Sequence, residues 1–187
     1  MSPYPLLRRC FEDAPVVDRN GYDYFVNPIS DGVPRVDPEA LREAVDGLIS
    51  EAGFDCDLIL APEAMGIPLA AGISLRTGIP FSVVRKKRYG LPGEREILQR
   101  TGYSESAMFL NGVGKGDRAF IVDDVLDTGG TVAAVAAAVR EAGASVAGVA
   151  VVYSMADVRA FSERIGAPVH ALLSVGVEDG RPFVRRT

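Results

Sequence analysis

Tryptophan is absent from this 187-residue sequence, aromatic residues make up only 7%, and there are two cysteines and one histidine. Cys10 and Cys56 lie far apart with no Cys or His nearby, so we expect neither a structural zinc site nor a disulfide framework. No segment reaches the ~18 uncharged apolar residues of a transmembrane helix, which excludes such a span and a membrane partner. Residues 1–15 lack the apolar core of a signal peptide, so we expect a cytoplasmic protein.

An excess of positive charge is missing as well. Lys and Arg total 20 and Asp and Glu total 25, a formal net charge of −5, which argues against a nucleic-acid partner. With 48% hydrophobic residues, the composition excludes an intrinsically disordered chain. The length suits one compact domain, so we expect residues 1–187 to form a single domain.

Short apolar runs alternate with helical stretches along most of the chain. Asp37, Pro38 and Glu39 are typical of a helix start, and Gly53 is placed to end that helix. Continuous apolar strands that alternate with helices indicate an α/β class: a doubly wound, mostly parallel sheet covered on both faces. The predicted strands are residues 57–62, 80–85, 119–123 and 146–153, and the further helices are 67–77, 131–142 and 156–165.

Residues 86–107 interrupt this alternation. The segment is polar, contains Gly and Pro, and shows little periodicity. A loop of this length inside a compact domain usually has a function, so we predict a flexible lid over a ligand site. A surface hairpin without a function is the alternative. The only histidine, His170, lies in an apolar run, and we interpret it as structural.

The most informative segment is residues 119–131. A buried apolar strand ends in Asp123 and Asp124, and the small residues 128–131 then lead into a helix. Ligands bind at the carboxyl ends of strands in open α/β sheets, and amides at a helix N-terminus hold phosphate. The two acids can accept hydrogen bonds from sugar hydroxyls beside that phosphate. An ordinary strand–turn–helix junction is the alternative. Neither Gly-Lys-Ser/Thr nor Gly-x-Gly-x-x-Gly is present, which disfavours triphosphate hydrolysis and hydride transfer.

Val122 to Thr131 resembles the phosphoribosyl-pyrophosphate (PRPP) motif of the type I phosphoribosyltransferases. The resemblance implies their fold, with a small hood to which residues 1–36 contribute. It also implies a reaction between PRPP and a free purine that requires Mg²⁺. Further segments look like the archaeal hypoxanthine (guanine) phosphoribosyltransferases, which are similar to adenine phosphoribosyltransferases: residues 24–32, 62–66, 85–94 and 101–104.

The resemblance assigns roles to individual residues. Asp123 and Asp124 would hold the ribose, with Mg²⁺ held mainly by PRPP and near these acids. The 5′-phosphate site comprises Asp127, Thr128, Gly129, Gly130 and Thr131. The pyrophosphate site comprises Glu63, Ala64, Met65, Gly66, Arg85, Lys86 and Lys87. The lid residues are Tyr103 and Ser104, and the purine site comprises Phe25, Val26 and Tyr153. The alternatives are a plain strand–helix turn at 63–66, a solvated basic face at 85–87 and a core role for Phe25.

Asp127 and its surroundings bear on the choice of purine. Enzymes that act on 6-oxopurines commonly have Asp at this position as a base for the imidazole proton, although the residue could instead cap the helix or face solvent. Gly102 replaces the Glu of adenine enzymes, but neither Lys nor Arg is near Tyr153, and Asn27 stands where the archaeal family has His. We therefore predict a hypoxanthine or guanine phosphoribosyltransferase that forms a homodimer. The alternatives are an adenine enzyme and a non-catalytic PRPP- or nucleotide-sensing protein.

Overall fold

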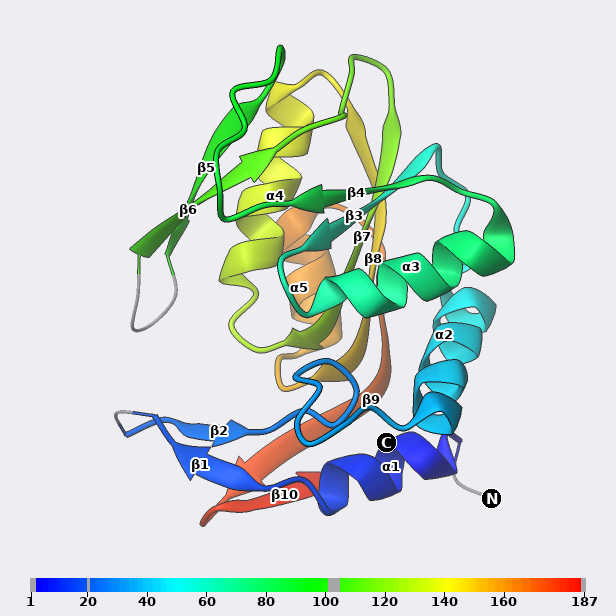
Figure 1. Cartoon of the computed structure of the whole chain (residues 1–187), viewed down its shortest axis with the longest axis vertical. Helices are drawn as coiled ribbons and strands as arrows, with labels where there is room; N and C mark the ends of the chain where they lie inside the picture. Colours follow the sequence, from blue (N-terminus) through cyan, green and yellow to red (C-terminus); the bar gives the residue numbers. More distant parts are fainter. Residues whose placement is uncertain (1–2, 20, 101–104, 186–187) are drawn as a thin grey trace.

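A six-stranded sheet forms the centre of the molecule in the computed structural model, which describes residues 3–19, 21–100 and 105–185. The strand order is β10-β9-β8-β7-β3-β4, and only β10 runs antiparallel to its neighbour. Figure 1 shows this sheet running through the molecule. The strands are β3 (Leu58–Pro62), β4 (Phe81–Val84), β7 (Arg118–Leu126), β8 (Ser145–Ser154), β9 (Val169–Glu178) and β10 (Arg181–Val184).

Five helices accompany the sheet in the described part of the chain. Asp37 caps the second of them by accepting a hydrogen bond from the Glu39 amide at 2.9 Å, and Gly53 ends it in the left-handed conformation with φ 67°, as predicted. No helix among the described residues has the length and apolar character needed to cross a membrane. The helices are α1 (Pro5–Glu12), α2 (Pro38–Ala52), α3 (Gly66–Thr77), α4 (Gly130–Glu141) and α5 (Val158–Ile165).

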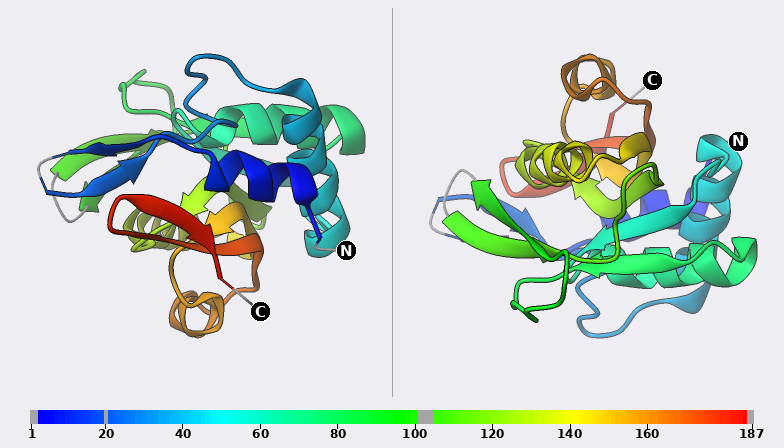
Figure 2. Two further views of the ribbon diagram at one scale, coloured as in Figure 1. Left: turned by 90° about the horizontal axis from the view of Figure 1, so that it is seen from below. Right: turned by 90° about the horizontal axis from the view of Figure 1, so that it is seen from above.

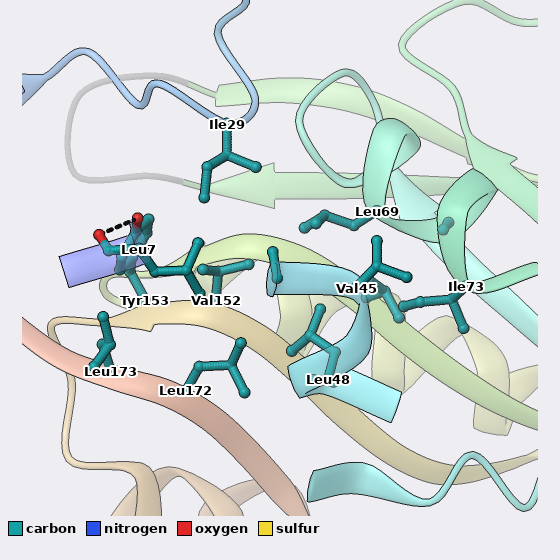
Figure 3. Packing of buried hydrophobic residues seen from close by; sticks show 14 of the residues in the cluster. Leu7, Ile29, Val45, Leu48, Leu69, Ile73, Val152, Tyr153, Leu172 and Leu173 are labelled. Carbon is teal, nitrogen blue, oxygen red and sulfur yellow. Dashed lines mark hydrogen bonds between the residues drawn. The ribbon is translucent and has the colours of Figure 1, made fainter. Parts of the chain in front are cut away.

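The sheet has a hydrophobic core on each face. Along β3, Ile59 and Ala61 join the core covered by α1, α2 and α3, whereas Leu58 and Leu60 join the core covered by α4 and α5. This alternation is the period of two expected of a strand buried on both faces. Figure 2 shows the two helical layers, and Figure 3 shows part of the first core. The structure confirms the predicted doubly wound α/β class.

A separate two-stranded sheet lies near the N-terminus. It consists of β1 (Val16–Asp18) and β2 (Asp23–Phe25), which pair antiparallel. In Figure 1 these strands lie below the carboxyl ends of the central strands, beside β10 and α1. Within the predicted contribution of residues 1–36, we use the name hood for residues 16–19 and 21–31, which comprise this hairpin and the turn that follows it.

A hairpin overlaps residues 86–107, the segment predicted as a flexible lid. β5 (Arg95–Arg100) and β6 (Glu105–Leu110) pair antiparallel with Ile97 opposite Met108, and both side chains are buried in the α4–α5 core. The alternation of buried Ile97 with exposed Leu98 is too short to stand out in the sequence. Tyr103 and Ser104 lie outside the described residues, and the lid function stays a prediction.

Candidate active site

A cavity of about 560 Å³ lies at the carboxyl ends of β3 and β7. Its volume is in the range of small-molecule sites, and its place is the one where α/β sheets bind ligands. The hood, the β3–α3 loop and β7 with the loop after it form most of its lining, together with Lys86 after β4 and Met108 of β6. The lining residues are Arg19, Gly21, Tyr22, Tyr24, Phe25, Asn27, Pro62, Glu63, Met65, Lys86, Met108, Asp123, Asp124, Val125, Asp127, Thr128, Gly129, Gly130, Thr131 and Val132.

Asp123 and Asp124 are buried side by side in β7, with 9% and 8% of their surface exposed. The Asp124 amide donates to Asp123 Oδ1 at 3.0 Å, while Asp124 Oδ2 accepts from Asn27 Nδ2 at 2.9 Å and from Ser30 Oγ. Burial raises the pKa of both carboxyl groups, and the charge of Asp124 raises the pKa of Asp123 further. Two desolvated carboxylates favour a partner that donates hydrogen bonds or brings positive charge.

The β7–α4 loop has the shape of an anion site. The N-cap of α4 is Gly129, with φ 74°, and a Cβ there would lie 2.0 Å from the Phe161 ring. Glycine is therefore required both by the backbone conformation and by the space available. Arg164 of α5 donates to the Thr128 carbonyl at 3.0 Å and supports the loop from behind. The backbone of residues 128–131 lies at the positive end of the helix dipole, which favours a phosphate.

Asp127 lies in the cavity wall, two residues before Gly129, the N-cap of α4. Its Oδ2 atom accepts a hydrogen bond from the Tyr22 hydroxyl at 3.0 Å. Its role as a base stays a prediction, as does the alternative that it caps the helix.

The β3–α3 loop forms the opposite wall. Glu63 Oε2 accepts from the Lys86 amide at 2.8 Å and lies 3.6 Å from Arg85 Nε, so this loop is joined to the start of the basic run. Glu63, Met65 and Lys86 line the cavity, while Ala64, Gly66, Arg85 and Lys87 do not. A Cβ on Gly66 would lie 2.5 Å from the Val122 carbonyl, so only glycine lets α3 begin this close to β7. The structure thus brings part of the predicted pyrophosphate site to the cavity.

The predicted purine residues separate into two groups. Phe25 lines the cavity, and its ring also packs edge-to-face on Phe11 at 4.8 Å, so it has the core role as well. Val26 and Tyr153 do not line the cavity. Tyr153 is fully buried, and its hydroxyl donates to the Leu7 carbonyl at 3.0 Å, as Figure 3 shows. Contact of these two residues with the purine stays a prediction, and the geometry does not support it.

Several hood residues at the site were missed from the sequence. The Arg19 guanidinium lies 3.7 Å from the centroid of the Tyr24 ring, and the Tyr24 hydroxyl donates to both Asp31 oxygens at 2.8 and 2.9 Å. Burial raises the pKa of Tyr24, and the hydrogen bond to Asp31 raises it further. Tyr24 lies in β2 and Tyr22 directly precedes that strand, and both line the cavity. Asn27, expected to affect base contacts, donates to Asp124 instead.

The buried acid pair, the glycine loop at a helix start and the doubly wound sheet together define a phosphoribosyltransferase. Residues 38–167 match the family model of the phosphoribosyl transferase domain, and the chain belongs to that family.

Similar proteins share most of the chain's length. The chain is 46% identical over 173 residues to the hypoxanthine/guanine phosphoribosyltransferase of Methanocella paludicola, covering 92% of this chain and 91% of that protein. It is 49% identical over 173 residues to HGPRTase-like protein 1 of Halalkalicoccus jeotgali, covering 92% and 95%. The crystal structure of adenine phosphoribosyltransferase from Thermoanaerobacter pseudethanolicus matches with a TM-score of 0.75 at 25% identity, covering 91% and 99%.

Proposed function

We propose that the protein is a purine-salvage enzyme that converts PRPP and hypoxanthine or guanine to IMP or GMP and pyrophosphate. The observation that carries the proposal is the buried Asp123–Asp124 pair beside the Gly129 loop, in one cavity with an aromatic hood. The relatives at 46–49% identity carry hypoxanthine/guanine phosphoribosyltransferase or HGPRTase-like names, whereas the similar adenine enzyme shares 25%. The higher identity to the hypoxanthine/guanine and HGPRTase-like relatives favours a 6-oxopurine over adenine.

The sugar phosphate would lie along β7 and the loop after it. Asp123 and Asp124 accept hydrogen bonds from the ribose hydroxyls, which supply donors to the two desolvated carboxylates. The backbone amides of residues 128–131 hold the 5′-phosphate at the start of α4. Lys86, in the opposite wall, offers a cation to the diphosphate that leaves. The chain thus binds PRPP at both of its charged ends.

The acid pair also fits Mg²⁺, because hard cations prefer carboxylate oxygens. Among the described residues, no group of three His, Cys, Asp or Glu side chains is placed to hold a metal ion. The two acids would therefore supply part of the coordination, and PRPP oxygens would supply the rest. When bound, Mg²⁺ neutralises charge on the diphosphate leaving group.

At the reacting centre, a bond forms between the purine nitrogen and ribose C1′ while the bond from C1′ to the diphosphate oxygen breaks. Asp127 accepts the proton that the purine imidazole ring loses, and a base so placed contributes a factor of about 10²–10⁴ in rate. We place the purine against Phe25, which lines the cavity. The electron pair of the broken bond leaves with pyrophosphate.

The test is pyrophosphate release from PRPP and Mg²⁺ with hypoxanthine, guanine, xanthine and adenine in parallel. Turnover with hypoxanthine or guanine supports the proposal, and turnover with adenine alone overturns the choice of purine. PRPP binding without turnover on any base indicates the sensing protein. As a control, Asp124→Asn should weaken PRPP binding by about 100-fold, the scale of losing charged hydrogen bonds to one ligand, and leave the circular dichroism spectrum unchanged. Unchanged PRPP affinity would contradict the ribose assignment.

The proposal includes a cytoplasmic homodimer. Leu75, near the end of α3, exposes 88% of its surface, and Phe81, at the start of β4, exposes 38%. These apolar side chains lie on either side of one turn and would be covered by a partner subunit. Sedimentation equilibrium of the purified chain tests this, since a mass near twice that of one chain is expected.

A further inference from the structure

The hood contacts the β7–α4 loop, which we call the phosphate loop, through Tyr22. This residue has no role in the reaction proposed above. The Tyr22 hydroxyl donates to Asp127 Oδ2 at 3.0 Å, although the two residues are 105 positions apart. Both side chains line the cavity and both are partly buried. The contact therefore joins the hood to the residue that we place at the reacting centre.

The hairpin turn holds Tyr22 in place. The Arg19 amide donates to the Tyr22 carbonyl at 2.9 Å, and the Tyr22 amide donates back to the Arg19 carbonyl at 3.3 Å. Gly21 lies inside this turn with φ 83°, a conformation that other residues rarely adopt. The tyrosine ring thus projects from a closed turn rather than from a free loop end.

A phenol is a suitable donor to a carboxylate that must accept a proton. The hydrogen bond from the Tyr22 hydroxyl to Oδ2 fixes the orientation of the Asp127 carboxylate. The proposal assigns the other oxygen, Oδ1, to the purine.

We propose that Tyr22 is a positioning residue that presents Asp127 to the imidazole proton of the bound purine. The inference rests on the proposed function, in which Asp127 is the base. It also gives the hood a second role, because the hairpin both encloses the purine and orients the base through its contact with the phosphate loop.

The charged groups around Asp127 come from several elements. Arg19 lies on the hood, Asp123 and Asp124 on β7, and Glu63 and Lys86 on the opposite wall, all of them in the same cavity. Arg164 of α5 reaches the neighbouring Thr128 carbonyl from behind. Tyr22→Phe removes one hydroxyl and leaves all of these charges, so a change in kcat reports on the lost hydrogen bond.

The experiment measures kcat and KM for hypoxanthine in the wild type and in Tyr22→Phe. We expect kcat to fall about 10-fold, the loss typical of one hydrogen bond to a charged group, while KM stays within about twofold. The affinity for PRPP alone, measured by calorimetry, should stay within about twofold.

Tyr24→Phe is the matched control, since it removes a hydroxyl from the same hairpin that donates to Asp31 and not to Asp127. Any loss in this variant should appear in KM and not in kcat. The inference is overturned if Tyr22→Phe keeps the wild-type kcat, or if both variants lower kcat equally, which would indicate a general loosening of the hood. A wild-type enzyme that turns over no purine overturns the proposed function, and this inference with it.

Discussion

The phosphate loop and the hood line the same cavity but are built in different ways. The loop continues β7, which pairs with β3 on one side and β8 on the other, so the sheet fixes its position. The hood is a two-stranded sheet of three-residue strands outside the central sheet, and such a hairpin is marginally stable alone. It reaches the site through hydrogen bonds to Asp124 and Asp127. One side of the site is preformed, and the other depends on a few polar contacts.

Gly129→Ala should have the largest effect on the preformed side. The new methyl group would overlap the Phe161 ring, and the residue would keep its φ of 74°. We expect a loss of about 3 kcal/mol in the free energy of unfolding, because overpacking adds to backbone strain. Urea denaturation of the free protein measures this loss.

Gly93→Ala is the control for backbone strain alone, since φ is 83° there and no atom lies within 4 Å of the added carbon. It should lose only about 1 kcal/mol. Equal losses in the two variants would show that crowding against Phe161 does not matter, and the phosphate loop would then be less rigidly supported than its contacts indicate.

Asn27→Asp should have the next largest effect, this time on the hood side. It replaces the amide that donates to Asp124 Oδ2 with a third carboxylate in a region where Asn27 is 2% exposed. We expect a loss of about 2 kcal/mol at neutral pH, because a buried carboxylate loses its donor and gains a like charge. The loss should shrink in acid, where one carboxyl group is protonated.

Asn27→Ala provides the comparison, because it removes the donor without adding charge. Thermal unfolding of both variants at pH 5 and pH 7 separates the two causes. A loss in Asn27→Asp that does not depend on pH would contradict the electrostatic explanation.

The contrast between the two sides also explains what the sequence could predict. Residues 119–131 carry a strand, two acids, a small-residue loop and a helix start in one continuous segment, so the spacing alone indicated an anion site. The hood contacts join Tyr22 to Asp127 and Asn27 to Asp124 across 105 and 97 positions, and no local spacing encodes such pairs. The strand β10 was missed because it is four residues long and contains a proline.

Asp123→Asn should have a smaller effect, and of opposite sign. Burial raises the pKa of Asp123 above its unfolded value, so the folded state binds protons more tightly and its stability falls as pH rises between the two values. The asparagine removes this cost and can still accept the hydrogen bond from the Asp124 amide. We expect a gain of about 1 kcal/mol at neutral pH, together with loss of activity.

Asp55→Asn is the control with the reverse sign, because the hydrogen bond from Arg118 lowers the pKa of this exposed carboxyl group. Its contribution to stability is present above the unfolded pKa and is lost as pH falls. Unfolding curves of both variants across the acidic range measure the two slopes. An Asp123→Asn protein less stable than the wild type at neutral pH would contradict the prediction that the buried Asp123 carboxylate lowers the stability of the folded state.

Tyr153→Phe should have the smallest effect. It tests whether Tyr153 belongs to the core or to the purine site. The hydroxyl donates to the Leu7 carbonyl and so joins β8 to α1, which packs beneath the hood. We expect a loss of about 1 kcal/mol in unfolding free energy, the usual value for one buried hydrogen bond. The ratio of kcat/KM for hypoxanthine and guanine should not change, because the ring lies outside the cavity wall.

Phe25→Leu makes this prediction sharper, because Phe25 lies in the same aromatic cluster but also lines the cavity. It should raise KM for the purine, whereas Tyr153→Phe should not. A change of purine preference in Tyr153→Phe would restore its predicted contact with the base. It would also mean that the hood moves far enough on binding to open the core behind it, since only that would bring a fully buried ring to the ligand.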